Sequence, residues 1–104
     1  MNLDHILNKL KSGQQLGKQF QFDEGSEKIW SAIAIQLWEG RYKVGWYEIA
    51  ESKMAADDFR FDRVISFNTL EEATEFVAKN TPFTVADFRP FKGQRVFNPR
   101  FDTE

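Results

Sequence analysis

The chain has 104 residues, a formal net charge of −2 and no cysteine. This length fits a single domain over residues 1–104, and the lack of cysteine excludes disulfides, thiolate metal sites and cysteine nucleophiles. The nearly balanced charge gives the whole molecule no strong attraction to nucleic acid or to an anionic membrane.

The first predicted element is a short amphipathic helix over Asn2–Ser12, because four apolar residues fall at helical spacing: Leu3, Ile6, Leu7 and Leu10. His5 lies between them and is expected at the surface. Lys18–Phe22 alternates and is predicted to be a short edge strand. The N-terminus lacks the basic start and apolar middle of a signal peptide, and no run is long enough to span a membrane. We therefore expect a cytoplasmic protein without a membrane partner.

Ile29 to Glu51 is predicted to form a long hairpin that turns at Glu39-Gly40. Isoleucine and tryptophan favour a pleated strand, the returning segment alternates, and glycine suits a short hairpin loop. Counting outward from this turn gives the predicted pairs Trp38 with Arg41, Leu37 with Tyr42, Ile35 with Val44 and Ile33 with Trp46.

The two faces of this hairpin differ in size and polarity. The predicted core face carries Ile29, Ile33, Ile35, Leu37, Tyr42, Val44 and Trp46. The other face has a flat strip of Ala32, Ala34 and Gly45, flanked by the aromatic residues Trp30, Trp38 and Tyr47. Two interpretations stay open: another segment of the chain covers this strip, or the strip is a docking surface, since exposed apolar patches mark interaction sites.

After a predicted loop over Ser52–Asp58, a third strand is expected over Arg60–Phe67. A second helix should begin at Asn68 as N-cap, with Glu71 three residues later. Its predicted apolar stripe is Leu70, Ala73, Phe76 and Val77. Asn80 is expected as a left-handed C-cap before Pro82. Thr84–Phe88 fits either a short strand or one helical turn.

These elements predict an α+β fold. It has an N-terminal helix, a three- to four-stranded antiparallel meander, a C-terminal helix packed on one face and an irregular, aromatic-rich tail.

The stretch from Trp46 to Phe76 contains eight acidic residues and three basic ones, a net charge of −5. One interpretation is a solvated face combined with helix-capping charges. The other is an acidic surface that docks a basic partner, since complementary charge speeds the encounter and selects the partner. The second interpretation rests on five acidic residues: Glu48, Glu51, Asp57, Asp58 and Asp62.

The tail interleaves basic residues with phenylalanines, a composition typical of surfaces that bind single-stranded nucleic acid. The basic residues are Arg89, Lys92, Arg95 and Arg100, among Phe88, Phe91, Phe97 and Phe101. The favoured interpretation is that the rings fold back onto the second face of the hairpin while the charged ends stay in water.

No catalytic motif is present, and Asp57, Asp58 and Asp62 lack the spacing and glycine of a calcium loop. We therefore expect neither an enzyme nor a metal site, a cofactor or a small-molecule substrate.

Trp30 opens the predicted long strand, Glu39-Gly40 forms its turn, and FNTLEEATEF spans Phe67–Phe76. In these features and in the order of its elements, the chain resembles small bacterial immunity proteins, which partner polymorphic or contact-dependent-inhibition toxins. The resemblance implies inhibition of a cognate protein toxin by tight binding in the cytoplasm. An acidic surface would then suit a basic nuclease toxin, with Trp30, Trp38 and Tyr47 as apolar anchors.

Overall fold

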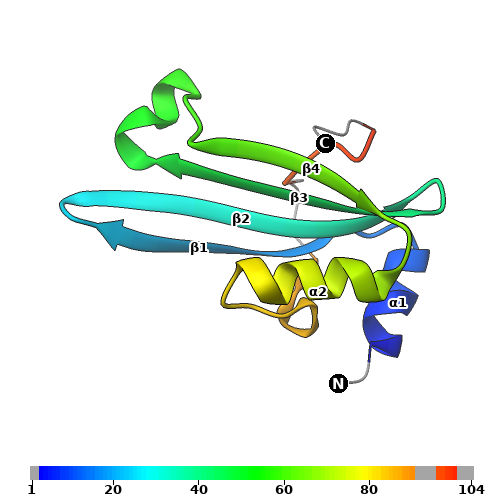
Figure 1. Ribbon diagram of the computed structural model, residues 1–104. Helices are drawn as coiled ribbons and strands as arrows, with labels where there is room; N and C mark the ends of the chain where they lie inside the picture. The colour runs from blue at the N-terminus through cyan, green and yellow to red at the C-terminus, as the bar shows by residue number, and fades with distance from the viewer. Residues whose placement is uncertain (1–2, 91–95, 101–104) are drawn as a thin grey trace.

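An antiparallel sheet forms the centre of the computed structural model, which describes residues 3–90 and 96–100 (Figure 1). Four strands form a meander: β1 Leu16–Glu24, β2 Glu27–Trp38, β3 Arg41–Ala50 and β4 Phe61–Phe67. A fifth strand, β5 Arg89–Pro90, pairs with β1, so that the order is β4-β3-β2-β1-β5. The predicted α+β class and antiparallel meander are confirmed. The meander has four strands, within the predicted three to four, but the sheet as a whole has five because the tail contributes this short strand.

The hairpin of β2 and β3 has the predicted register. Trp38 pairs with Arg41, and the pairing continues through Ile35 with Val44 to Ile33 with Trp46. Glu39 and Gly40 have φ values of 50° and 79°. Both lie in the left-handed region, as the twist-matched two-residue hairpin turn requires.

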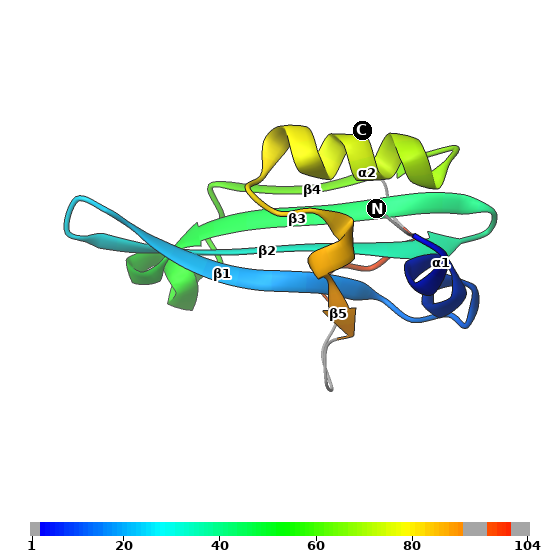
Figure 2. The same cartoon turned by 90° about the horizontal axis from the view of Figure 1, so that it is seen from below.

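Two helices, α1 Asp4–Lys11 and α2 Leu70–Asn80, cover one face of the sheet (Figures 1 and 2). The predicted inward residues Ile33, Ile35 and Val44 are buried beneath them. The main core comprises Ile6, Leu10, Leu16, Ile33, Ile35, Val44, Ala73, Val77, Val85 and Phe88. Burying the larger of these side chains contributes roughly 1.5–3 kcal/mol each.

Both ends of α2 differ from the prediction. Thr69, not Asn68, is the N-cap, and its hydroxyl oxygen accepts the Glu72 N–H at 3.1 Å. Asn80 does not adopt the left-handed conformation. It is the last helical residue, and its side-chain amide donates to the Phe76 carbonyl at 2.8 Å.

Two other segments are more regular than the sequence predicted, and at a third the structure decides between two predicted alternatives. The predicted loop over Ser52–Asp58 contains a 3-10 helix, η1 Glu51–Ala56, which ends at Asp57 with φ 51°. Thr84–Phe88 is a helical turn, with η2 spanning Val85–Asp87. The edge strand predicted over Lys18–Phe22 is the nine-residue β1.

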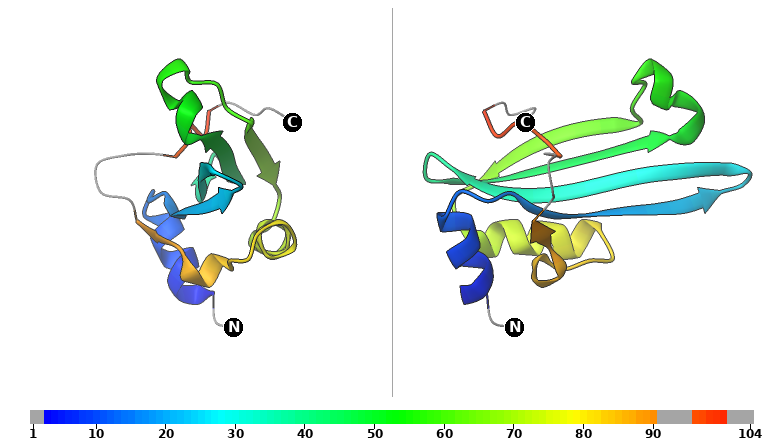
Figure 3. Two further views of the ribbon diagram at one scale, coloured as in Figure 1. Left: turned by 90° about the vertical axis from the view of Figure 1, so that its left-hand side faces the viewer. Right: turned by 180° about the vertical axis from the view of Figure 1, so that it is seen from behind.

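The tail crosses to the face opposite the helices, where residues 96–100 lie against the sheet (Figure 3). Phe97 is 8% exposed and packs with Ala34 and Val64. A Cβ at Gly45 would overlap the Phe97 ring, so glycine is what admits the ring there. The interpretation that another segment covers this strip is confirmed.

The side chain of Gln15, just before β1, holds this part of the tail. Its Oε1 accepts the Val96 N–H at 2.7 Å, and its Nε2 donates to the Phe97 carbonyl at 3.0 Å. The same Nε2 lies 2.9 Å from Oε1 of Gln36, which is buried. This chain of hydrogen bonds satisfies polar groups under the tail, where an unpaired one would cost about 1–3 kcal/mol.

Candidate functional site

The end of the sheet farthest from the Glu39-Gly40 turn extends beyond both helices (Figure 1). It consists of residues 23–28, which form the β1–β2 turn and its flanks, and residues 47–62, which include η1. We call these residues the acidic tip. Its acids are Asp23, Glu24, Glu27, Glu48, Glu51, Asp57, Asp58 and Asp62, and its bases are Lys28, Lys53 and Arg60. The tip therefore carries −5, against −2 for the whole chain.

Arg60 connects two strands of the acidic tip. Its guanidinium donates to both carboxylate oxygens of Glu24, at 3.2 and 3.3 Å, and lies 3.5 Å from the Glu48 carboxylate. The Glu48 side chain is only 16% exposed. One cation thus serves two carboxylates, and the group keeps a charge of −1 that a basic partner could neutralise.

Glu27 joins β2 to η1. Its Oε1 accepts a hydrogen bond from the Ser52 hydroxyl and a second from the Ser52 N–H at 3.1 Å. These bonds, the hydroxyl bond foremost, lower the pKa of Glu27 below its ordinary value because they favour the ionised form. The carboxylate therefore stays charged to a lower pH than a free glutamate does.

The five predicted acidic residues gather at this end but lie on both faces. Glu51, Asp57 and Asp58 are exposed on η1 and the residues after it. In the β3–β4 register Glu48 pairs with Phe61, whereas Asp62 pairs with Tyr47, so these two acids point to opposite faces. The acidic surface wraps around the tip instead of occupying one face.

Two of the three predicted aromatic anchors lie at or next to the acidic tip, on the face away from the helices. Tyr47 belongs to the tip, and Trp30 follows it on β2. Tyr47 packs edge-on against Phe59, with 5.4 Å between ring centroids, and partial burial raises its pKa. Trp30 is half-buried, and its indole nitrogen has no hydrogen-bond partner among the residues described. Trp38 lies instead beside the hairpin turn, 6.0 Å below the Arg100 guanidinium.

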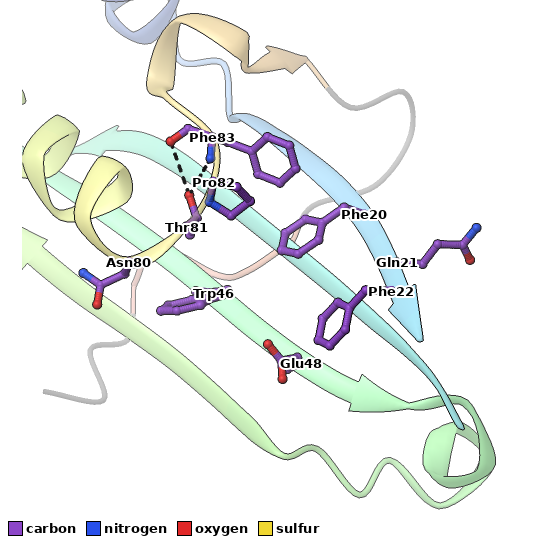
Figure 4. Close-up of a pocket in the computed structure, with 9 residues that line it drawn as sticks. All are labelled: Phe20, Gln21, Phe22, Trp46, Glu48, Asn80, Thr81, Pro82 and Phe83. Atoms are coloured by element: carbon purple, nitrogen blue, oxygen red, sulfur yellow. Dashed lines mark hydrogen bonds between the residues drawn. The ribbon is translucent and has the colours of Figure 1, made fainter. Parts of the chain in front are cut away.

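A second feature, absent from the sequence-based prediction, is an aromatic cleft of about 460 Å³ on the helix side of the sheet (Figure 4). It is lined by Phe20, Gln21, Phe22, Trp46, Glu48, Asn80, Thr81, Pro82 and Phe83. Phe83 packs on Phe20 at 4.8 Å, and the Glu48 carboxylate lies at the tip end between Trp46 and Phe22. The alternation of residues 18–22 placed Phe20 and Phe22 on one face, but did not show that α2 ends short of them.

The tail offers less to nucleic acid than its composition suggested. Phe88 and Phe97 are buried, at 1% and 8% exposure, and cannot stack on bases. Arg89 is exposed, but its guanidinium donates to the Ala86 and Phe88 carbonyls at 3.1 and 2.8 Å. Arg100 is exposed above Trp38. The other two predicted cations, Lys92 and Arg95, and the other two predicted rings, Phe91 and Phe101, lie outside the described residues.

The described residues contain no group of three or more histidine, aspartate or glutamate side chains placed to hold a metal ion. Within residues 3–90 and 96–100, no helix is long and apolar enough to cross a membrane. Comparison of the chain with protein-family models, with curated proteins and with solved structures finds no match.

Proposed function

We propose that the chain is a non-enzymatic binding protein that neutralises a cognate protein toxin through its acidic tip. The observation that carries the proposal is the charge of −5 at one end of the sheet, beyond the cover of both helices. The resemblance of the element order to bacterial immunity proteins supports the same function and favours the cytoplasm of the producing cell.

The charge of the tip suits a partner with a basic active surface. Charge complementarity across an interface accelerates diffusional encounter and discriminates against wrong partners. A nuclease must attract phosphates, so its substrate-binding surface is basic. A tip in which carboxylates outnumber cations would occupy such a surface in place of nucleic acid.

Binding also needs apolar contacts, because exposed ion pairs are worth only about 0–1 kcal/mol each. The acidic tip and the residues next to it supply them on both faces: half-buried Tyr47 and Trp30 on one, the aromatic cleft on the other. Aromatic residues dominate the binding energy of most interfaces. Glu48, at the cleft end nearest the tip, places a carboxylate where a partner's lysine or arginine would meet aromatic rings.

The alternative, a single-strand nucleic-acid-binding module using the tail, has weaker support. Its stacking platform would need exposed rings between the arginines, and the two tail phenylalanines in the described part of this segment, Phe88 and Phe97, are buried.

The test is co-expression with the product of the gene adjacent to the one encoding this chain, scored by rescue of growth and by affinity in vitro. The tip variant combines Asp57→Asn with Asp58→Lys. Asparagine is chosen because Asp57 has φ 51°, a conformation that asparagine tolerates and lysine does not. The control variant, Glu71→Lys with Glu75→Gln on α2, makes the same change of charge at exposed positions away from the tip.

We expect the control to protect as the native chain does, and the tip variant to bind at least about tenfold more weakly. Unchanged protection and affinity in the tip variant would remove the acidic-tip mechanism. Failure of the native chain to bind or protect would remove the proposed toxin partner.

A further inference from the structure

The outer edge of β1 has no partner strand over most of its length in the described part of the chain. It shares Asp23 and Glu24 with the acidic tip, and Phe20 and Phe22 with the aromatic cleft. β5 pairs only with Leu16 and Gly17, and no strand in the described part of the chain pairs with the same edge from Lys18 to Glu24. This open segment contains no proline and no bulge, since its pairing with β2 is continuous. Such an edge is a template for another strand unless it is protected.

The direction of the free backbone groups follows from β5. Pro90 has no N–H, so Gly17 and Arg89 must be the hydrogen-bonded pair of the β1–β5 ladder. The N–H and C=O groups of alternate residues point to the same edge. The groups of Gln19, Gln21 and Asp23 therefore point outward, while those of Lys18, Phe20 and Phe22 are directed to β2.

The open segment is complementary to itself. When two copies pair antiparallel about a two-fold axis at Gln21, Lys18 of one copy faces Glu24 of the other. In the same register Phe20 faces Phe22, Gln19 faces Asp23, and Gln21 faces Gln21. Opposite charges and aromatic rings are the cross-strand pairs that stabilise antiparallel strands.

The backbone supports the same register. Gln21, Gln19 and Asp23 are the residues with outward groups, so each of their N–H groups meets a carbonyl of the other copy. Phe20 and Phe22 then occupy non-hydrogen-bonded pairs, where side chains approach most closely. The paired segment has a structural limit at each end. The chain turns at Gly25 after Glu24, and β5 occupies the edge at Gly17.

Five of the seven side chains that would be covered are exposed in the single chain, whereas Lys18 and Phe20 are half-buried. Phe22 is 38% exposed and packs on Phe20, with 6.5 Å between ring centroids. Phe20 in turn contacts Phe83. Pairing would join the aromatic clusters of both copies into one row on the helix side, with an ion pair at each end.

We propose that two copies of this chain form a dimer through β1, making one continuous antiparallel sheet. A two-fold interface uses the same patch on both copies, so one substitution alters two contacts. This symmetry makes charge exchange a sharp test.

The experiment is sedimentation equilibrium of the full chain, with the native sequence, Lys18→Glu, Glu24→Lys and the double exchange. We expect a dimer for the native chain, a dissociation constant at least about tenfold higher for each single variant, and recovery in the double exchange. Lys28→Glu, which makes the same charge change as Lys18→Glu on β2, should leave the dimer intact. A native chain that remains monomeric at about 1 mM would overturn the proposal.

Amide hydrogen exchange supplies a readout that needs no substitution. The amides of Gln19, Gln21 and Asp23 should gain protection as the concentration rises, because no strand in the described part of a single copy pairs with them. A dimer in which these three amides exchange freely, or which the charge exchange does not affect, would place the contact elsewhere and overturn the proposal.

Discussion

Substituting alanine at Gly45 tests whether the tail covers the sheet, because the result should change sign with residue 97. The added Cβ would approach the Phe97 side chain to less than 3.0 Å, whereas ordinary contact is 3.4–4 Å. The ring must then leave its site against Ala34 and Val64. Losing the burial of one phenylalanine costs about 1.5–3 kcal/mol. Alanine in place of glycine within a strand returns about 0.5–1 kcal/mol.

Gly45→Ala should therefore destabilise the native chain by about 0.5–2.5 kcal/mol. In a Phe97→Ala background the overlap is gone, and the same substitution should stabilise by about 0.5–1 kcal/mol. The four variants form a double-mutant cycle that urea denaturation can measure. Equal effects of Gly45→Ala in both backgrounds would refute the contact between Phe97 and the small-residue strip.

Two further predictions concern helix capping and pH. Thr69→Ala should destabilise by about 0.5–2 kcal/mol in urea denaturation because it removes the observed cap, whereas Asn68→Ala should stay within about 0.5 kcal/mol. A larger loss of stability for Asn68→Ala than for Thr69→Ala would show that Asn68 is the N-cap. Ser52→Ala should raise the pKa of Glu27 toward its ordinary value, followed by NMR titration of the carboxylate. Since the folded pKa of Glu27 is lowered, its stabilisation is present above the ordinary value of 4.5 and is lost as the pH falls through the folded pKa. Ser52→Ala should accordingly lower the free energy of unfolding at neutral pH and leave it unchanged in acid. An unchanged Glu27 titration would contradict this account.

The hairpin could be predicted in register because its information is local. Alternation after Arg41 set the faces, and Gly40 fixed the turn from which pairs are counted. The cap of α2 could not be fixed in the same way. Asn68 and Thr69 are both good caps, each followed three residues later by a glutamate. In the structure Thr69 is the extended residue that precedes the helix, with φ −129° and ψ 155°.

The acidic tip could be predicted only in part because half of it depends on tertiary contacts. The acids from Glu48 to Asp62 are close in sequence, but Glu24 and Glu27 join them through Arg60 and Ser52. The edge strand predicted over Lys18–Phe22 stops short of Asp23 and Glu24, although an edge strand exposed to water tolerates such polar residues.

The tail was ambiguous for a different reason. Its phenylalanines serve both faces of one sheet: Phe88 packs in the core under the helices, and Phe97 on the opposite face. Composition does not show which residues of the tail lie on which face of the sheet. In the structure β5 pairs with the edge strand β1, between the part of the tail that carries Phe88 and the part that carries Phe97.

The central claim, that the acidic tip is the binding surface, is tested most directly by stopped-flow association with the adjacent-gene product over a range of salt. Because complementary charge steers encounter and salt screens it, the association rate constant of the native chain should fall steeply as salt rises. The association rate constant of the Asp57→Asn, Asp58→Lys variant should be lower at low salt and should decrease less as salt rises. The rate constant of the α2 control should follow that of the native chain. Identical salt dependence for the tip variant and the native chain would show that the tip does not guide binding.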